Sequence, residues 1–411
     1  MISKTIWILN HYAISPDMAG GTRHHDLGKE LVRKGCDVTI FASGFDHGTK
    51  RYIKISSKER ITTETYNGVR FVWVNTHPYY GNNWHRIVNM ASYGTRVLGA
   101  CKGIQKPDVI IGSSLHPFAV LAGWWLAKRY KARFIFEVRD LWPQTAVDMG
   151  AMKNISLLAR MLYAWEKFMY QRAEKIIVLL SNAKEYIVKR GIDPRKIIWI
   201  PNGVDLERFD NPDPLEPSSE AKRVFSQHSD KIKVVYAGAH GPANGLEVII
   251  EAAKILSRQA KPIHFILIGD GPEKTKLIQK TESPGIGNIS FLDPVPKSQI
   301  PAVLQQADIL VHCLKPLKVF KYGISPNKLF DYLASGKTII MSAQASDEII
   351  KQSKAGICVE PGNPDALVEG ILNIIQMDPI QRKQFGTNGR AYVERYHSIQ
   401  VLGEKLYNIL K

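Results

Sequence analysis

The sequence predicts an α/β protein with two doubly wound, Rossmann-like domains, and three observations support this fold class. Short runs rich in Ile, Val and Phe recur along the chain, each of the length typical of a buried strand. Helical patterns lie between several of these runs, as expected where helices cover both faces of a parallel sheet. The proline-rich segment over residues 205–230 has no sustained apolar period, so it is expected to be a linker that divides the runs into two series.

Each series contains enough strands for a sheet of its own. In the first half the expected strands are Thr5–Leu9, Asp37–Ala42, Val69–Val74, Asp108–Gly112, Arg133–Val138 and Lys175–Leu180, and the expected helices include Thr22–Lys34, Phe118–Tyr130 and Ile155–Gln171. In the second half the expected strands are Lys233–Ala237, Ile263–Gly269, Ile289–Leu292, Ile309–His312, Thr338–Met341 and Ile357–Val359, and the expected helices are Leu246–Ser257, Ser298–Gln306, Pro326–Ser335 and Pro364–Ile375. Two further helices, Pro379–Tyr396 and Ile399–Lys411, close the chain. The expected domains cover residues 1–200 and 201–384, with the final helices over residues 385–411.

The composition is that of a soluble globular enzyme. The longest apolar run, Pro117–Ala127, has eleven residues, which is too short to span a bilayer as a helix. The N-terminus lacks the long apolar region of a signal peptide, and the four cysteines stand far apart without metal-ligand spacing. These features predict a cytoplasmic protein with unpaired thiols and no metal site.

The basic charge of the chain lies in its first half. Residues 1–200 carry 30 Lys and Arg against 15 Asp and Glu, which is +15, whereas residues 201–411 carry 25 against 23, which is +2. Basic surfaces attract nucleic acid, anionic lipid or acidic substrates. The sequence has no nucleic-acid-binding motif, so nucleic acid is disfavoured, while a basic surface that serves solubility alone remains an alternative.

The segment Tyr322–Met341 has the strongest functional signal. Ser325 is expected to cap a helix over Pro326–Ser335, whose first turn would present free N–H groups and Lys328 to a phosphate. One turn later, Asp331 could accept hydrogen bonds from a ribose diol. The pattern predicts a seat for a nucleotide diphosphate, and the alternative is an ordinary capped helix with a solvated Lys and Asp.

Other candidates follow strands of the first half. Gly20 and Gly21 precede a helix and would let a substrate approach backbone N–H groups, and the alternative is that they only form the turn. His116 stands at the carboxyl end of a strand, where open α/β sheets bind ligands. The segment FEVRDLWPQ combines a cation, carboxylates and an aromatic ring, and an internal Arg–carboxylate network is the alternative to a binding role. Its candidate residues are Glu137, Arg139, Asp140 and Trp142.

Two glycine-rich turns in the second half are candidates for phosphate binding. Tyr236–Leu246 reads YAGAHGPANGL, a strand followed by a turn and a helix. Ile268–Lys274 reads IGDGPEK, a weaker signal because Lys274 occupies the position of a third glycine. The loop around Pro294–Lys297 could hold a nucleotide base through backbone contacts.

Together these motifs resemble those of the retaining glycosyltransferases of family four, which have the GT-B fold of two Rossmann-like domains facing across a cleft. The residues that carry the resemblance are IPNGVDLERF at Ile200–Phe209, the GDGP turn, FLDPVPKSQIPAVLQQADILV and SPNKLFDYLASGKTII. FEVRDLWPQTAVDMG and SSLHPF look most like the bacterial surface-polysaccharide enzymes typified by L-fucosamine (N-acetylfucosamine) transferases.

The resemblance implies transfer of a sugar, an N-acetylated hexosamine or deoxyhexosamine, from a UDP-sugar to a lipid-linked glycan in O-antigen, capsule or exopolysaccharide synthesis. It implies no cofactor and no metal, an acceptor-binding first domain and a donor-binding second domain. The implied catalytic residues are Arg139, Asp140 and Lys328. The implied donor-binding residues are Gly238, His240, Asn244, Gly245, Gly269, Val295, Pro296, Ser325, Asn327, Lys328 and Asp331, and the implied acceptor-binding residues are Gly20, Gly21, His116, Glu137 and Trp142.

A membrane location is also implied, because such acceptors are carried on polyprenyl diphosphate at the inner face of the cytoplasmic membrane. Trp84, Trp124 and Trp125 have basic neighbours in the sequence and would suit contact with anionic lipid. Buried tryptophans beside solvated basic residues are the alternative.

Two departures from the family pattern concern the donor site. The arginine and lysine that usually face the donor diphosphate are replaced by Ala239 and Asn244, and the first of two glutamates eight residues apart is replaced by Gly323. Lys328 is therefore expected to act as the replacement cation. A UDP-sugar epimerase of the same fold and a non-catalytic nucleotide-sugar-binding protein remain as alternatives.

Overall fold

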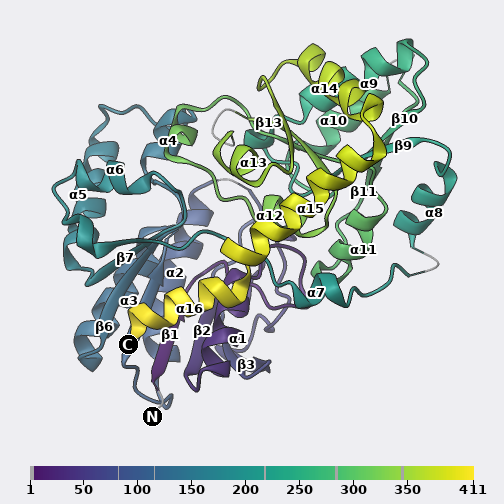
Figure 1. Cartoon of the computed structure of the whole chain (residues 1–411). Coiled ribbons are helices and arrows are strands. Elements are labelled where there is room, and N and C mark those ends of the chain that lie inside the picture. The colour runs from purple at the N-terminus through teal and green to yellow at the C-terminus, as the bar shows by residue number, and fades with distance from the viewer. Residues whose placement is uncertain (1–3, 82, 115, 217–218, 283–285, 344–346) are drawn as a thin grey trace. The chain divides into compact units, whose positions relative to one another are not determined.

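The computed structural model describes residues 4–81, 83–114, 116–216, 219–282, 286–343 and 347–411 (Figure 1). The chain divides into two units. The first unit comprises Met1–Pro16, Thr22–Pro201 and Ile399–Lys411, and the second comprises Asp17–Gly21 and Asn202–Ser398. Each unit is a helix-covered, mainly parallel sheet, so the expectation of two Rossmann-like α/β domains is confirmed.

The first unit is built on a sheet with the strand order β3-β4-β2-β1-β5-β6-β7-β8. All neighbouring strands pair in parallel except β3 and β4, which form an antiparallel pair at one edge. Every residue of β1 and β5 is buried, which explains why these strands are continuous apolar runs. The strands are β1 (Thr5–Leu9), β2 (Asp37–Ser43), β3 (Ile61–Tyr66), β4 (Val69–Val74), β5 (Val109–Ser113), β6 (Arg133–Val138), β7 (Lys175–Val178) and β8 (Ile197–Trp199).

Helices cover both faces of this sheet. The chain runs along the sheet in opposite directions between β1 and β2 and between β4 and β5, and right-handed crossovers then place the connecting helices on opposite faces. Accordingly α1 packs against α16, which Figure 1 shows in yellow in front of the strands, whereas α2 packs against α3 and α3 against α5. The helices are α1 (Arg23–Arg33), α2 (Trp84–Ala100), α3 (Pro117–Tyr130), α4 (Gln144–Asp148), α5 (Leu157–Arg172), α6 (Ala183–Val188) and α16 (Ile399–Leu410).

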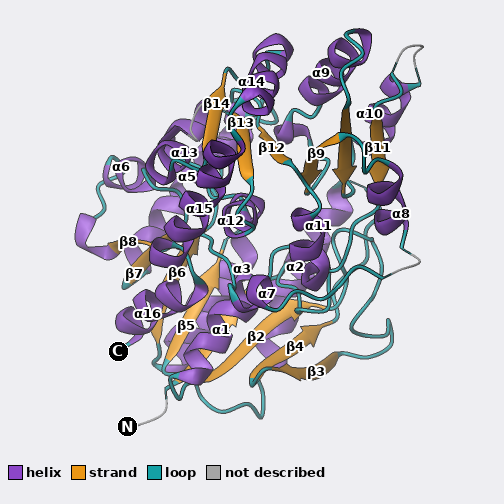
Figure 2. Cartoon of the chain, turned by 45° about the vertical axis from the view of Figure 1, so that its right-hand side comes forward, coloured by secondary structure: helices purple, strands orange, loops and turns teal. Residues whose placement is uncertain are grey.

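The second unit has an all-parallel sheet with the order β11-β10-β9-β12-β13-β14. Figure 2 shows its strands in orange, side by side. Alternate residues of a strand enter two separate apolar cores, one on each face of the sheet, as Val234 and Val235 of β9 illustrate. The strands are β9 (Ile232–Ala237), β10 (Ile263–Ile268), β11 (Ile289–Leu292), β12 (Ile309–Cys313), β13 (Thr338–Ser342) and β14 (Gly356–Val359). The longer helices are α8 (Glu220–Gln227), α9 (Glu247–Arg258), α10 (Lys274–Thr281), α12 (Asn327–Ala334), α14 (Pro364–Gln376) and α15 (Pro379–Tyr396).

The segment expected to be a linker differs from that expectation. Within residues 205–230 lie a short helix α7 (Glu207–Asp210) and the helix α8. Ala221, Val224 and Phe225 of α8 recur at helical spacing and are buried in a core of the second unit. The prolines that precede α8 break the apolar pattern into a stretch too short to be recognised as periodic.

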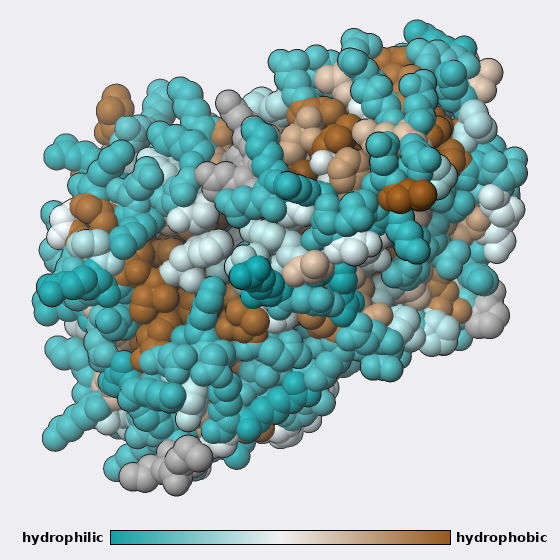
Figure 3. Space-filling model, viewed as in Figure 1, coloured by the Kyte–Doolittle hydropathy of each residue, from teal (hydrophilic) through white to brown (hydrophobic). Residues whose placement is uncertain are grey.

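The C-terminal region also divides at a different residue from the one expected. α15 packs against α12 and β13 and groups with the second unit, whereas α16 groups with the first unit. The change of unit therefore falls at Ser398 and Ile399 instead of at residue 385. The outward surface of α15 is mainly hydrophilic, whereas apolar atoms are visible in the region of α16 (Figure 3).

No helix in the described ranges combines the length and the apolar character that crossing a membrane requires. In the same ranges, no group of three or more His, Cys, Asp and Glu side chains is placed to hold a metal ion.

Candidate functional site

Lys328, in the first turn of α12, has its ammonium group beside the end of β9. Its Nζ donates hydrogen bonds to Tyr236 Oη at 2.5 Å and to Asn244 Oδ1 at 2.7 Å, and it lies 4.5 Å from the centroid of the Tyr236 ring. Gly238 leaves room for this side chain, because an added Cβ would lie 2.7 Å from Lys328 Cε. Asn244, which replaces the lysine of the family pattern, therefore orients the ammonium group of another lysine.

The environment of Lys328 destabilises the charged form of its side chain, so the amine loses its proton more easily than that of an exposed lysine. Desolvation lowers the pKa of Lys328 to about 7. Within the described part of the chain, neither hydrogen-bond partner of Nζ is a carboxylate. A bound diphosphate would give the ammonium group the negatively charged partner that these two hydrogen bonds do not provide.

The two glycine-rich turns of the second unit lie against each other. Gly269 has a φ of +144°, and an added Cβ would lie 2.0 Å from the carbonyl oxygen of Gly238. The His240 N–H donates to the Asp270 carbonyl at 2.8 Å, which joins the turns further. Gly245, with a φ of +58°, ends the first turn before α9. A side chain at position 269 would collide with the other turn, and Gly245 has the left-handed conformation that favours glycine, so both glycines help to fix the shape of the turns.

His240 is fully buried in the first of these turns, and its ring nitrogens have no hydrogen-bond partner among the described residues. Burial, with a smaller effect of Lys274, lowers the pKa of His240 to about 4. The imidazole is therefore neutral at pH 7. It can accept a hydrogen bond from a ligand that reaches it, or donate one to that ligand.

The expected cap of α12 is wrong in one detail. Pro326 occupies the N-cap position and the helix covers Asn327–Ala334, because the Ser325 hydroxyl has another partner. Ser325 Oγ accepts a hydrogen bond from the Asn202 N–H at 2.8 Å, and the Ser325 carbonyl accepts one from Asn202 Nδ2 at 2.5 Å. The IPNGVD and SPNK motifs are thus bonded to each other. The helix ends at Ala334, one residue before the expected end, and Gly336 follows with a φ of +69°.

Asp331 is buried and forms an ion pair with Lys297, whose Nζ lies 2.5 Å from Asp331 Oδ2. Lys297 follows Val295 and Pro296 in the loop expected to hold the base. The ion pair joins this loop to the carboxylate expected to bind the ribose diol. Sequence reasoning placed Lys297 in the loop but gave its side chain no role. The ribose role of Asp331 and the base-binding role of the loop stay predictions.

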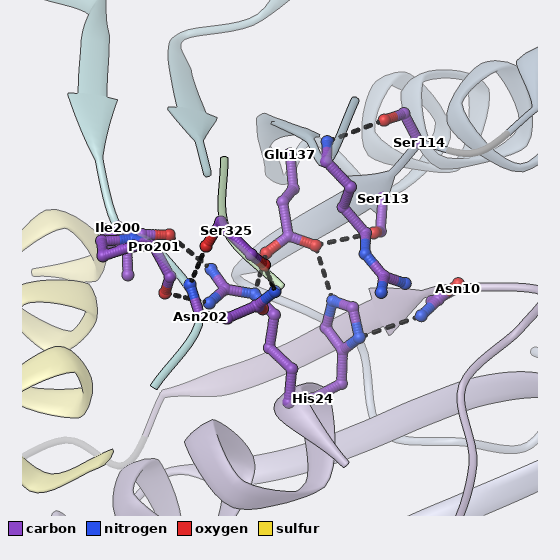
Figure 4. Close-up of polar contacts among 11 residues, drawn as sticks. Asn10, His24, Ser113, Ser114, Glu137, Ile200, Pro201, Asn202 and Ser325 are labelled. Atoms are coloured by element: carbon purple, nitrogen blue, oxygen red, sulfur yellow. Dashed lines mark hydrogen bonds and ion pairs between the residues drawn. The ribbon is translucent and has the colours of Figure 1, made fainter. Parts of the chain in front are cut away.

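Glu137, at the end of β6, is the centre of a buried polar network in the first unit (Figure 4). Its Oε1 accepts a hydrogen bond from Arg23 Nε at 2.9 Å, and its Oε2 is 2.6 Å from both His24 Nε2 and Ser113 Oγ. Burial alone would raise the pKa of Glu137, but the adjacent His24 and Arg23 hold it well below its usual range. The carboxylate is therefore charged, and both of its oxygens are hydrogen-bonded within the network.

Arg23 extends this network to the end of the first unit. Its Nη1 and Nη2 donate to the carbonyl oxygens of Pro201 and Ile200, the residues at which the chain leaves this unit (Figure 4). This is the internal Arg–carboxylate network that was the alternative for the FEVRDLWPQ segment, with Arg23 in place of a neighbouring arginine. Contact of Glu137 with an acceptor stays a prediction.

The other candidates of this segment are more accessible. The Arg139 N–H donates to Ser114 Oγ at 3.0 Å, and the Arg139 side chain is half-buried. Asp140 is exposed, and its carbonyl accepts a hydrogen bond from the N–H of half-buried Trp142 at 2.9 Å. These three residues are therefore available to a substrate, and their proposed roles are untested.

His116 is buried and caps α3, where its Nδ1 accepts a long hydrogen bond of 3.4 Å from the Ala119 N–H. Its ring packs edge-on against those of His11 and Tyr12, which follow β1. Burial lowers the pKa of His116 to about 3, so the ring is neutral. Sequence reasoning missed this aromatic cluster, because its members follow different strands.

Gly20 and Gly21 stand immediately before Thr22, the N-cap residue of α1. Gly20 has a φ of +130°, a conformation that favours glycine, and it is exposed. Their role in acceptor binding stays a prediction.

Two family models match the chain in succession. The model described as Glycosyltransferase Family 4 matches residues 20–208, and the model described as Glycosyl transferases group 1 matches residues 218–392. The first covers most of the first unit, and the second covers the two glycine-rich turns and α12.

The curated relatives include proteins of polysaccharide and glycolipid synthesis. The chain is 25% identical over 296 residues to the "Putative colanic acid biosynthesis glycosyl transferase WcaI" of Escherichia coli K12, which is 71% of this chain and 70% of that protein. It is 25% identical over 282 residues to a GDP-mannose-dependent phosphatidylinositol monomannoside mannosyltransferase of Corynebacterium glutamicum, which is 65% of this chain and 72% of that protein.

Solved structures with the same fold cover nearly the whole chain. Sucrose-phosphate synthase from Thermosynechococcus elongatus has a TM-score of 0.74 at 17% identity and covers 99% of this chain and 98% of its own. HepE from Anabaena, in complex with UDP-glucose, has a TM-score of 0.70 at 15% identity and covers 99% of both chains. These likenesses establish the GT-B fold.

Proposed function

We propose that this chain moves a sugar from a UDP-sugar to a lipid-linked glycan. The premise is that it carries the two domains of a family-four type of glycosyltransferase. The observation that carries the proposal is the Lys328 ammonium group, held beside two glycine-rich turns without a carboxylate partner in the described structure. A cation and close backbone approach are what a donor diphosphate needs.

In the proposed reaction the anomeric C–O bond to UDP breaks as the acceptor oxygen bonds to the same carbon with retention. The acceptor proton passes to an oxygen of the β-phosphate, and UDP leaves. Lys328 stabilises the charge that develops on this diphosphate. Arg139 and Asp140 position the acceptor and the sugar, and no metal takes part.

The choice of donor and acceptor has separate support. HepE was solved with UDP-glucose, and the E. coli relative is named for colanic acid biosynthesis, which favour a UDP-sugar donor and bacterial surface polysaccharide. The name of the C. glutamicum relative pairs a GDP-sugar with a lipid acceptor, so both nucleotides belong in the test. The resemblance to L-fucosamine transferases favours an N-acetylated hexosamine or deoxyhexosamine, and a lipid acceptor implies work at the inner membrane face.

The test is to incubate the full chain with UDP- and GDP-sugars, with and without a polyprenyl-diphosphate sugar, and to measure nucleotide release and product mass. Acceptor-dependent UDP release with a gain of one sugar mass is the expected result. Donor binding without release would favour the nucleotide-sugar-binding protein, and an altered sugar without acceptor would favour the epimerase.

UDP binding is expected to take up a proton above pH 7. The pKa of Lys328 is about 7 in the free protein, and a bound diphosphate raises it, so binding at higher pH must recharge a neutral amine. Affinity should then fall by up to about tenfold per pH unit between pH 7.5 and 9, where UDP itself is fully ionised because its terminal phosphate has a pKa of about 6. Calorimetry in buffers of different ionisation enthalpy measures this proton. Its absence at pH 8.5 would show that Lys328 does not face the diphosphate.

Gly238→Ala is expected to weaken UDP binding by about tenfold without unfolding the protein. The new Cβ would lie 2.7 Å from Lys328 Cε and 3.0 Å from its Nζ, so the flexible lysine must move away from Asn244. Gly99→Ala in α2 is the matched control, because an added Cβ there meets no atom within 4 Å. Equal affinity of the two variants would contradict the placement of Lys328 in the donor site.

A further inference from the structure

Large apolar side chains are exposed where α5 begins. Ile155, which precedes the helix, is 87% exposed, and Leu157 and Met161, one turn apart in α5, are 74% and 62% exposed. Leu158 between them is 58% exposed. Water-exposed residues of this size and number are costly unless another apolar phase covers them.

A second exposed pair lies on the same face of the first unit. Trp84 and Ile87, in the first turn of α2, are 64% and 60% exposed. α3 packs between the two helices, against α2 on one side and α5 on the other. α2 follows β4 in the chain, and α5 follows β6 and α4. The first turns of both helices therefore lie at the end of the sheet that carries the carboxyl ends of the strands, where β6 stops at the Glu137 network. We name these six residues the apolar surface: Trp84, Ile87, Ile155, Leu157, Leu158 and Met161.

The charge of the three helices that form this face is almost entirely positive. α2, α3 and α5 together contain seven Lys and Arg and a single acidic residue, Glu166. Glu166 is buried and is 2.8 Å from Arg190 Nε, so it contributes no exposed negative charge. Lys153 and Arg160 are exposed directly beside the apolar side chains. The face thus combines exposed apolar groups with exposed cations.

We propose that the apolar surface docks the protein on an anionic phospholipid bilayer. Leu, Ile and Met enter the boundary of the acyl chains, Trp84 lies at the level of the headgroups, and Lys153 and Arg160 pair with lipid phosphates. The lack of exposed acidic residues on the three helices distinguishes this partner from a typical protein partner, whose surface carries both signs of charge. The purpose of docking rests on the proposed function. Docking would bring the carboxyl ends of the strands to a lipid-linked acceptor while the acceptor stays in the bilayer.

The test measures sedimentation of the full chain with phosphatidylcholine vesicles that contain or lack phosphatidylglycerol. The variant Ile155→Ser/Leu157→Ser/Met161→Ser should bind the anionic vesicles at least about tenfold more weakly than the unaltered chain. Ile380→Ser is the matched control, because Ile380 is 78% exposed on α15 of the second unit. It should bind as the unaltered chain does, and added salt should weaken binding of both.

Sugar transfer to a water-soluble acceptor analogue is measured on the same samples. The triple variant should keep this activity, so loss of docking and failure of the proposed reaction are distinguishable. Equal vesicle binding by the triple variant and the Ile380→Ser control would overturn the proposal. A dimer in solution that the triple variant converts to a monomer would also overturn it, since the surface would then be a subunit interface.

Discussion

Lys328→Ala is expected to lower kcat/KM for the donor by about 10²–10³-fold, with a higher KM and a lower kcat. The variant removes the cation that Tyr236 and Asn244 hold beside the glycine-rich turns. Both parameters change because the ammonium group binds the donor diphosphate in the ground state and stabilises its growing charge as the glycosidic bond breaks. Initial-rate kinetics over a range of donor concentrations measure the two effects separately.

Lys321→Ala is the matched control for this variant. Lys321 is exposed to solvent near the start of α12, and its ammonium group lies over the ring of Tyr322 at 4.9 Å from the centroid. Its kinetics should equal those of the unaltered chain. If Lys328→Ala also retained full activity, another group would have to stabilise the leaving diphosphate and the donor site would need reassignment.

Glu137→Gln is expected to destabilise the first unit by about 3–5 kcal/mol, because it leaves the buried guanidinium of Arg23 without its carboxylate. All eight tryptophans of the chain lie within residues 1–200, so tryptophan fluorescence during urea unfolding reports on this unit alone. The midpoint of that transition should move to lower urea with an unchanged slope.

The comparison for this second variant is Glu174→Gln. Glu174 forms an ion pair of 2.7 Å with Arg133 at the surface, where its side chain is 45% exposed. Removing such a pair should cost about 1 kcal/mol or less. Similar shifts for both glutamines would mean that the network around Glu137 contributes little to stability, and would return this residue to consideration as an acceptor ligand.

Strands were predictable where burial makes them continuous apolar runs. β1, β4 and β6 have the expected bounds, because nearly all of their residues are buried and most of them are apolar. The edge strand β11 also has the expected bounds, although Leu292 is its one buried residue. The edge strand β3 was not predicted. Its side chains are exposed or half-buried in alternation and it pairs on one side only, so it lacks the apolar signal.

The site was predictable residue by residue but not in its pairings. Lys328 could be identified from the start of its helix, yet its partners Asn244 and Tyr236 are 84 and 92 residues away. The ion pair of Glu137 with Arg23 spans 114 residues. Such contacts arise from the order of strands in the sheets, which local sequence patterns do not encode.

The grouping of α16 with the first unit determines the order in which the two units can be completed. α1 packs against α16, and its residues 23–31 are buried in the finished fold. On a ribosome, residues 202–398 emerge before α16 does. Every segment of the second unit from Asn202 onward can therefore fold while α1 is not yet packed against α16. The first unit can therefore be completed only after residues 202–398 of the second unit have been synthesised.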